Sequence, residues 1–328
     1  MTKLAACVFL LPALAVAPFA HALDRSRPDV RAFIEETAEQ LNLDKKTLGD
    51  LLAQAETKQA ILDAISKPAE RVVPWFEYRD RFLTERRIQQ GADFWAANTA
   101  ALEGIRDPGI AATVSGILGV ETSYGRITGR YRVLDALATL AFDYPPRAPF
   151  FRSELQQFLA LAREESVDPK TALGSYAGAM GIPQFIPSSY RKFAIDGNGD
   201  GKRDLWSSWE DVISSVANYL RVHGWREGEP VVVTATLQDT DLTRFNTATI
   251  ELNETVGSLR NKGVAFVTDQ PEDAPAMFFV LQGKDGPEYR VGFNNFYVIT
   301  RYNRSTMYSL AVHELGNAIQ GFMQDVKR

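Results

Sequence analysis

Residues 119–125 read Gly119-Val120-Glu121-Thr122-Ser123-Tyr124-Gly125, and they end a segment whose apolar residues recur at helical spacing. Those apolar residues are Ile110, Val114, Ile117 and Leu118. Because Glu121 follows Leu118 by three residues and Ile117 by four, its side chain projects from the same apolar face of a helix. An apolar setting and the negative end of the helix dipole both raise the pKa of a carboxyl group. A carboxyl that keeps its proton near neutral pH can act as a general acid on a leaving group.

Taken alone, the same segment also fits a helix-terminal Glu121 whose carboxylate turns to solvent. Groups with shifted pKa values occur in structural ion pairs as well as in active sites, so a shifted carboxyl is not by itself an active site. The choice between the two interpretations depends on the rest of the chain.

The composition is that of a globular protein. The chain has 328 residues, of which 45% are hydrophobic, so it can build two or three packed lobes. Its formal net charge of −5 argues against nucleic acid as a partner. Cys7 is the single cysteine, so stability must come from packing, and from bound ions, without an internal disulfide.

The N-terminus predicts an export signal over residues 1–22. Lys3 precedes an apolar run over residues 4–19, and Ala20-His21-Ala22 has the small-x-small pattern of a cleavage site. We therefore expect cleavage after Ala22 and a periplasmic product. The run Leu4-Ala5-Ala6-Cys7 resembles a lipoprotein cleavage site, but only three residues precede it, so we do not expect lipid anchoring at Cys7. An uncleaved transmembrane anchor is the alternative, although the apolar run is short for a bilayer span.

Beyond the signal, the pattern predicts an α+β protein that is mainly helical. Helical spacing covers about 28–65, 84–105 and 151–165, and it returns from 305 to 326. Segments rich in β-branched and aromatic residues follow residue 229, with a hairpin turn at Gly283-Lys284-Asp285-Gly286. We predict a helical lobe at 23–85 joined by a C-terminal helix at 305–328, a catalytic core at 86–228, and a small β subdomain at 229–300.

Residues 175–190 combine small residues with polar and aromatic ones. Small residues let a backbone approach a bulky ligand closely. A polysaccharide needs hydrogen-bond partners for its hydroxyl and acetamido groups and aromatic faces for its sugar rings. The residues of these types are Ser175, Tyr176, Gln184 and Phe185. The alternative interpretation is a tight structural contact between two helices through the glycines of this segment.

Residues 196–204 match the opening of an EF-hand calcium loop. Oxygen-bearing side chains stand at positions one, three and five, and a glycine stands at position six. The usual glutamate at position twelve is replaced by Ser207, but Glu210 could close a lengthened loop. We predict a structural Ca²⁺ site within 196–210, formed by Asp196, Asn198, Asp200, Lys202 through its carbonyl, and Glu210. The alternative is a solvated turn.

The sequence lacks the residues needed for several other common kinds of site. The three histidines, His21, His223 and His313, are too few and too scattered for a zinc site. The sequence contains no nucleotide-binding loop and no Gly-x-Ser-x-Gly elbow, and we expect no organic cofactor. Acid–base chemistry by Asp or Glu remains.

Together these motifs resemble the lytic murein transglycosylase B family of bacterial cell-wall enzymes. The matching runs are 119–122, 175–190, 196–206 and Phe296-Tyr297-Val298-Ile299-Thr300-Arg301-Tyr302-Asn303, followed by Tyr308. The resemblance implies a lysozyme-like core with a helical lobe and a small β lobe. It also implies that the β-1,4 bond between N-acetylmuramic acid and N-acetylglucosamine is cleaved without water, which leaves a 1,6-anhydro end.

The resemblance assigns a role to each matching residue. It makes Glu121 the single acid and base, with the substrate's acetamido group assisting. Arg147 resembles a contact to the peptide stem, although the family often has a second arginine where Pro146 stands, which puts stem specificity in doubt. We expect peptidoglycan as the partner, other cell-wall enzymes as further candidates, and a monomer. The predicted groove residues are Ser175, Gln184, Tyr302, Asn303 and Tyr308.

Three rival functions fit parts of the sequence. A lysozyme-type muramidase would use the same acid and a water held by a second carboxylate, for which Asp135 and Asp143 are candidates. A non-catalytic peptidoglycan-binding scaffold would keep the groove and leave the acid idle. A calcium sensor would use the 196–210 loop as a switch.

Overall fold

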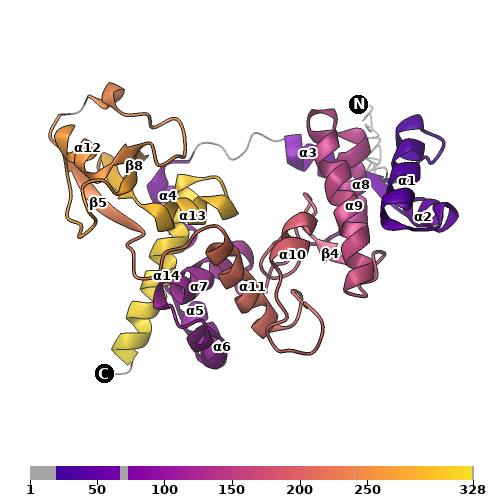
Figure 1. Ribbon diagram of the computed structural model, residues 1–328, viewed down its shortest axis with the longest axis horizontal. Coiled ribbons are helices and arrows are strands. Elements are labelled where there is room, and N and C mark those ends of the chain that lie inside the picture. The colour runs from indigo at the N-terminus through magenta and orange to yellow at the C-terminus, as the bar shows by residue number, and fades with distance from the viewer. Residues whose placement is uncertain (1–19, 67–72, 240, 327–328) are drawn as a thin grey trace, which may run out of the picture.

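The computed structural model describes residues 20–66, 73–239 and 241–326 (Figure 1). The predicted signal residues 1–19, Cys7 among them, lie outside the described residues. Within the described ranges the chain forms fourteen α-helices, two two-stranded sheets and one five-stranded sheet. The mainly helical α+β prediction is therefore confirmed. In the same ranges, no helix is both long enough and apolar enough to cross a bilayer.

The N-terminal helices pack onto a pair of long helices from the middle of the chain. The amphipathic segments are α1 (Pro28–Leu41), α2 (Lys45–Leu52) and α3 (Gln59–Ser66). The helix α1 packs on α2 and on α9 (Ala148–Glu164), α3 packs on α8 (Val133–Asp143), and α8 and α9 lie beside each other. Apolar side chains such as Val30, Leu52 and Ile61 are fully buried there, so this lobe shares the core of α8 and α9.

A short strand precedes these helices. The strand β1 (Ala20–Ala22) pairs antiparallel with β2 (Glu56–Lys58), which also contacts α8. Its three residues are the last three of the predicted signal segment, so cleavage after Ala22 would remove the strand. That cleavage stays a prediction.

The helix α7 (Pro108–Thr122) lies at the centre of the other helical group. It is surrounded by α5 (Glu85–Ala97), α6 (Thr99–Gly104), α11 (Trp209–Val222) and α14 (Thr306–Val326). The single helix expected across 84–105 is two helices, because the backbone of Asn98 leaves the helical region at φ −121° and ψ 25°. Every residue of α7 from Ile110 to Gly119 is buried, so this helix has no solvent face.

The closest packing in the molecule's helical part joins α7 to the C-terminal helix. A Cβ at Gly116 would overlap the carbonyl group of Val312, and one at Gly316 would overlap that of Ala112. Two glycines, one on each helix, therefore let the backbones of α7 and α14 touch.

The predicted grouping of both chain ends in one lobe is wrong. The C-terminal helix packs mainly on α7 and α5, whereas α1 packs on α9 and α3 packs on α8. Figure 1 shows α14 and α1 on opposite sides of the molecule. Among the helices that lie within the described residues of 23–85, α4 (Trp75–Asp80) is the neighbour of α14. Helical periodicity gives the buried face of a helix but does not say which helix covers it.

The β subdomain is a five-stranded antiparallel sheet in the order β6-β8-β9-β5-β7. Its long strands are β8 (Pro275–Gln282) and β9 (Pro287–Gly292), joined by the predicted hairpin turn, and β5 (Val232–Leu237). The short edge strands are β6 (Glu254–Thr255) and β7 (Val264–Ala265). One face packs around Phe278 and Val291 with α12 (Val256–Asn261), next to the short helix Leu242–Arg244.

The remaining elements connect the two helical groups. A two-stranded sheet pairs β3 (Tyr131–Arg132) with β4 (Leu173–Gly174), and α10 (Pro187–Phe193) packs on both α9 and α11. The helix α13 (Asn294–Tyr302) then leads from the β subdomain into α14. These connections bring the motifs around residues 121, 184 and 302 to one region of the molecule.

Candidate active site

Glu121 is the second-last residue of α7. The helix starts at an Asp107 cap, whose carboxylate accepts hydrogen bonds from the amides of Gly109 and Ile110. It ends because Ser123 and Tyr124 both take left-handed backbone conformations, with φ of 52° and 58°. The catalytic candidate therefore lies near the C-terminal end of a helix that is buried from residue 110 to residue 119, as the apolar spacing predicts.

The setting of Glu121 favours its neutral form. Burial raises the pKa of the Glu121 carboxyl from 4.5 to about 7. The hydroxyl of Tyr308 donates a hydrogen bond to Oε1 at 2.6 Å, which lowers the pKa by a smaller amount. Since Oε1 accepts from Tyr308, the acid's own proton belongs on Oε2. The alternative of a carboxylate turned freely to solvent does not describe this side chain.

Two tyrosines from the C-terminal part of the chain accompany Glu121. Tyr308 is buried in the first turn of α14, and Tyr302 ends α13. The Tyr302 hydroxyl donates to the carbonyl of Pro183 at 2.5 Å. Burial, and then the neighbouring Glu121 charge, raise the pKa of both phenols well above the usual value. Both phenols are thus hydrogen-bond donors at any physiological pH.

The 175–190 segment is bonded directly to the end of α7. The Thr122 hydroxyl donates to the carbonyl of Ile182 at 2.9 Å. Gln184 has a left-handed backbone, with φ of 55°, and its side-chain amide donates to the carbonyls of Gly181 and Thr128. The Ser175 hydroxyl accepts from the amides of Ala177 and Ala179. These bonds form a compact loop structure and exclude the alternative of two touching helices.

The aromatic residues of this segment differ in exposure. Tyr176 is 40% exposed, so it is accessible to a ligand, and its contact with sugar stays a prediction. Phe185 is only 2% exposed, and its ring packs between those of Tyr219 and Tyr302. The prediction that Phe185 offers a face to a sugar ring is therefore wrong, because that face supports Tyr302.

Two predicted residues lie outside the contacts around Glu121. Asn303 is exposed, and its carbonyl accepts from the amide of Ser305 at 2.7 Å. Arg147 ends the short helix Pro145–Arg147, and its guanidinium lies over the rings of Phe150 at 4.4 Å and Phe151 at 5.3 Å. Arg147 is thus at the start of α9, while Asn303 follows Tyr302 directly.

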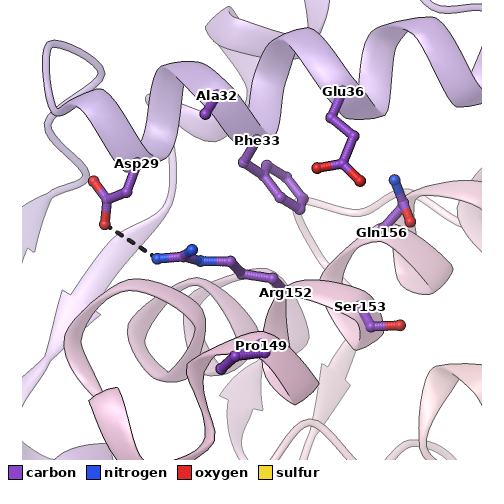
Figure 2. Close-up of a pocket in the computed structure, with 8 residues that line it drawn as sticks. All are labelled: Asp29, Ala32, Phe33, Glu36, Pro149, Arg152, Ser153 and Gln156. Atoms are coloured by element: carbon purple, nitrogen blue, oxygen red, sulfur yellow. Dashed lines mark hydrogen bonds and ion pairs between the residues drawn. The ribbon is translucent and has the colours of Figure 1, made fainter.

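A hollow of about 370 Å³ lies between α1 and α9, beyond Arg147 (Figure 2). Arg152 crosses it and pairs with Asp29 at 3.4 Å. None of the predicted site residues lines it. Its lining is Asp29, Ala32, Phe33, Glu36, Pro149, Arg152, Ser153 and Gln156.

The predicted calcium loop has an EF-hand-like opening. The Asp196 carboxylate accepts from the amides of Gly199, Asp200 and Gly201, so the chain wraps around it. The Asn198 side-chain oxygen accepts from the Asp200 amide, and the Asp200 carboxylate accepts from that of Lys202. Hard oxygen atoms of this kind are the donors that Ca²⁺ prefers.

The predicted closing residue of this loop is wrong. Glu210 is exposed and borders a separate hollow beside Ala101 and Ile105. Asp211 is fully buried, and its carboxylate accepts from the amides of Gly197, Asn198 and Asp204. Neighbouring residues on a helix point about 100° apart, so a one-residue error in register selects the wrong acid.

The oxygen atoms of the loop are of the kind that binds calcium, but the carboxylates of the described residues do not lie close enough together to hold an ion. No group of three or more histidine, cysteine, aspartate or glutamate side chains within the described ranges is placed to hold a metal ion. Asp196, Asn198 and Asp200 therefore supply a suitable first half, and Asp211 currently binds backbone amides.

The candidate second carboxylates of a muramidase are engaged elsewhere. Asp135 is fully buried and forms ion pairs with Arg132 at 2.7 Å and Lys58 at 3.3 Å. Asp143 pairs with Arg27 at 2.6 Å. Both bind the N-terminal lobe to α8, so neither is free to hold a water molecule beside Glu121.

Comparison with known proteins decides the family. The family model described as "Transglycosylase SLT domain" matches residues 25–317. The chain belongs to this family. It is 38% identical over 306 residues to the membrane-bound lytic murein transglycosylase B of Escherichia coli strain K12, covering 90% of this chain and 83% of that protein.

Solved structures agree in fold. The catenated lytic transglycosylase SltB1 from Pseudomonas aeruginosa is 46% identical with a TM-score of 0.87, over 90% of this chain and 98% of that one. Escherichia coli Slt35 in complex with calcium is 36% identical with a TM-score of 0.81, over 96% and 99%. Pseudomonas aeruginosa SltB3 in complex with NAG-anhNAM-pentapeptide is 30% identical with a TM-score of 0.76, over 89% and 79%. The predicted lysozyme-like architecture is thereby confirmed.

Two residues to which the sequence analysis gives no role make contacts at the site. Thr122 follows the acid directly, and its hydroxyl also accepts from the amide of Gly125 at 3.0 Å. The sequence offers one sign of this role, because a threonine at the end of a helix often forms hydrogen bonds with nearby backbone groups. Asp211 is the other, and only its burial distinguishes it from Glu210.

Proposed function

We propose that this chain is a lytic transglycosylase that cleaves the β-1,4 bond between N-acetylmuramic acid and N-acetylglucosamine in peptidoglycan. The observation that carries the proposal is a partly buried Glu121, whose pKa is raised to about 7 and which is bonded to Tyr308, in a member of the transglycosylase SLT family. The relatives support the substrate class, since one is named for murein and another was solved with NAG-anhNAM-pentapeptide.

In the first step, Glu121 acts as the general acid. Its proton moves from Oε2 to the glycosidic oxygen as the bond from that oxygen to the muramic C1 breaks. The positive charge that grows at C1 is stabilised by the oxygen of the substrate's own 2-acetamido group, as in substrate-assisted glycosidases. Tyr308, which already donates to Oε1, stabilises the carboxylate that is left.

In the second step, Glu121 acts as the general base. The carboxylate takes the proton from the C6 hydroxyl of the same muramic residue while that oxygen bonds to C1 and releases the acetamido group. Intramolecular attack is favoured over attack by water because the hydroxyl is already held near C1. The product is a 1,6-anhydro end, and Glu121 is protonated again.

The test is a digestion of purified peptidoglycan sacs, with mass spectrometry of the released fragments. Wild type should give 1,6-anhydromuramyl ends, and Glu121→Gln should lose about 10²- to 10⁴-fold in rate while still binding the sacs. Glu103→Gln, the same change on an exposed part of α6, is the matched control and should leave the rate unchanged. Reducing muramic ends would establish a muramidase, and binding without release by wild type would establish a scaffold.

We also propose a structural Ca²⁺ site in the 196–210 loop. The relative Slt35 was solved in complex with calcium, which supports it. Asp196, Asn198, Asp200 and the Lys202 carbonyl would hold the ion, and Asp211 in place of Glu210 would close the loop after exchanging its amide bonds for the ion. The bound ion would supply charge that fixes the loop next to the 175–190 segment.

For location and assembly, we propose export to the periplasm with cleavage after Ala22, and a monomer. The export pattern of residues 1–22 supports the first point, and one relative is named as membrane-bound. N-terminal sequencing of the exported protein tests the cleavage, since a start at any residue other than Leu23 would contradict it. Light scattering of the same sample tests the monomer.

A further inference from the structure

The loop that leaves the catalytic helix, residues 123–130, is held in one conformation. The amide of Ile127 donates to the carbonyl of Thr122 at 3.0 Å, and the Gln184 side chain donates to the carbonyl of Thr128 at 3.0 Å. At its far end, a Cβ on Gly129 would overlap the carbonyl of Gly174, so these two backbones touch. Side chains on this loop therefore keep fixed positions beside the end of α7.

The loop and the strand that it touches carry exposed apolar side chains. Ile127 is 69% exposed, Leu173 of β4 is 46% exposed, and Tyr176 is 40% exposed. Leu173 and Tyr176 lie on either side of Gly174 in sequence, and Ile127 lies two residues before Gly129. All three come from the two segments that meet at the Gly129–Gly174 contact. Exposed apolar residues that gather at one place mark binding surfaces more often than scattered ones do.

The same loop presents two arginines without acidic partners. Arg126 and Arg130 are exposed, and neither forms an ion pair with any residue in the described ranges. Arg126 reaches only the carbonyl of Ser123 at 3.4 Å, and Arg130 lies over the ring of Tyr131 at 5.8 Å. The next arginine, Arg132, is in contrast paired with Asp135 at 2.7 Å. In a chain with a net charge of −5, these two guanidinium groups, on the loop that follows the catalytic helix, form a local positive site.

We propose that Arg126, Ile127, Arg130 and Leu173 form a second contact surface for the acidic peptide stems of peptidoglycan, separate from Arg147. The inference rests on the proposed function. The glycan backbone of N-acetylated sugars is neutral, and the negative charge of the polymer lies on the carboxylates of the stems. Guanidinium groups bind carboxylates with paired hydrogen bonds, and Ile127 and Leu173 can cover the methyl groups of stem alanines. Charge and apolar character therefore select the stem and not the sugar.

The surface also fits its place in the chain. Residues 123–130 connect the catalytic helix α7 to β3, so a stem bound there lies within a few residues of Glu121. Arg147 stands at the start of α9, and Pro146 replaces the second arginine that the family often has at that place. Two arginines on the 123–130 loop would supply carboxylate contacts from a different segment.

The experiment compares two substrates with one pair of double variants. Glycan strands that keep their stems and strands stripped of stems by an amidase are digested by wild type, by Arg126→Gln/Arg130→Gln and by the control Arg31→Gln/Arg86→Gln. The control changes two exposed arginines on α1 and α5. We expect the KM of the first variant for stem-bearing strands to rise about tenfold, to the value for stripped strands, with the control unchanged. Removing the stem leaves the lactyl carboxylate on each muramic residue, so for wild type added salt should raise the KM for stem-bearing strands more than the KM for stripped strands.

The outcomes separate the two proposals. An unchanged KM ratio between the two substrates in Arg126→Gln/Arg130→Gln would overturn the stem-binding surface while leaving the transglycosylase intact. No activity of wild type on either substrate would instead overturn the proposed function. Thermal unfolding of each variant controls for folding, and Ile127→Ser gives an independent check, because it should raise the KM for stem-bearing strands without any change in charge.

Discussion

At the scale of single residues, the balance around Glu121 decides what it can do. Burial raises its pKa and the Tyr308 hydrogen bond lowers it, with burial the larger effect. A stronger donor would make the acid a permanent carboxylate, and removing the donor would leave an unpartnered buried oxygen. With a pKa of about 7, the group can both release and accept a proton near neutral pH.

The shifted pKa of Glu121 predicts a pH-dependent cost to stability. The unfolded chain loses this proton near pH 4.5, whereas the folded protein holds it up to about pH 7. Between these values the unfolded state binds fewer protons, so the free energy of unfolding falls as pH rises, by about 3 kcal/mol in total. Glu121→Gln should therefore be more stable than wild type at pH 8 and close to it at pH 4.

Urea unfolding of both proteins at pH 4, 6 and 8 measures this difference. Glu103→Gln is again the control and should follow wild type at every pH. A gap between Glu121→Gln and wild type that does not grow from pH 4 to pH 8 would show that the carboxyl is not desolvated.

Sequence alone located the acid and much of its surroundings. Helical spacing fixes the face from which Glu121 projects, and that requires only residues 110–121. It could not supply the Tyr308 bond, because the two residues are 187 positions apart. Phe185 was misassigned because an aromatic residue in a ligand-binding segment can equally well support its neighbours, and only its 2% exposure separates these roles.

At the scale of elements, the 196–210 loop shows how register limits prediction. The spacing of Asp196, Asn198 and Asp200 is sufficient to predict the first half of the loop, because all three residues lie on the same local turn. The closing acid comes from the first turn of α11, and the choice between Glu210 and Asp211 depends on how that helix is rotated against the loop. Asp211 faces the loop, as its bonds to the amides of Gly197 and Asp204 show.

Calcium should stabilise this protein measurably. An ion that binds only the folded state adds about 2.7 kcal/mol when its concentration is 100 times its Kd. We expect Ca²⁺ to raise the melting temperature, Mg²⁺ to do so less, and Asp196→Asn/Asp200→Asn to abolish the Ca²⁺ effect. Asp273→Asn/Asp285→Asn, two exposed acids in the β subdomain, is the control. Differential scanning fluorimetry after chelation reads the shift, and an equal response to Ca²⁺ in both double variants would exclude the loop as the binding site.

At the scale of the whole molecule, the arrangement of lobes was the least predictable feature. The elements themselves were largely foreseen, including the β8–β9 hairpin and the helices of 28–65. Their partners were not, since α14 meets α7 through Gly116 and Gly316, and two glycines far apart in sequence carry no visible signal for such a contact. The spacing of apolar residues predicts which face of a helix is buried. It does not predict which other helix covers that face.

The contact between the β subdomain and α14 predicts sensitivity to acid. His313 of α14 borders a hollow of about 350 Å³ shared with β5 and β9, where Arg79, Arg290 and Glu314 are the charged neighbours. Burial lowers the pKa of His313 from 6.5 to about 4. As pH falls from 6.5 to 4, the unfolded state binds more protons, so stability should decrease by up to about 3 kcal/mol.

Comparison with His313→Gln isolates this effect, because glutamine stays neutral throughout. Unfolding in urea at pH 4.5, 5.5 and 6.5 should show the difference between variant and wild type shifting in favour of the variant as pH falls. His223→Gln, at the C-terminal end of α11, serves as a comparison for a smaller shift in the same direction. If wild type and His313→Gln lose stability in parallel, His313 is not buried as a neutral base.

The bond between Tyr308 and Glu121 also bears on when the protein becomes active. A ribosome makes residue 121 long before residue 308, and the donor lies on α14. Until that helix docks on α7, the acid lacks its partner and the close-packed glycine contact around it. A chain that ends before Tyr308 should therefore lack this bond, and its acid should work poorly even if α7 folds.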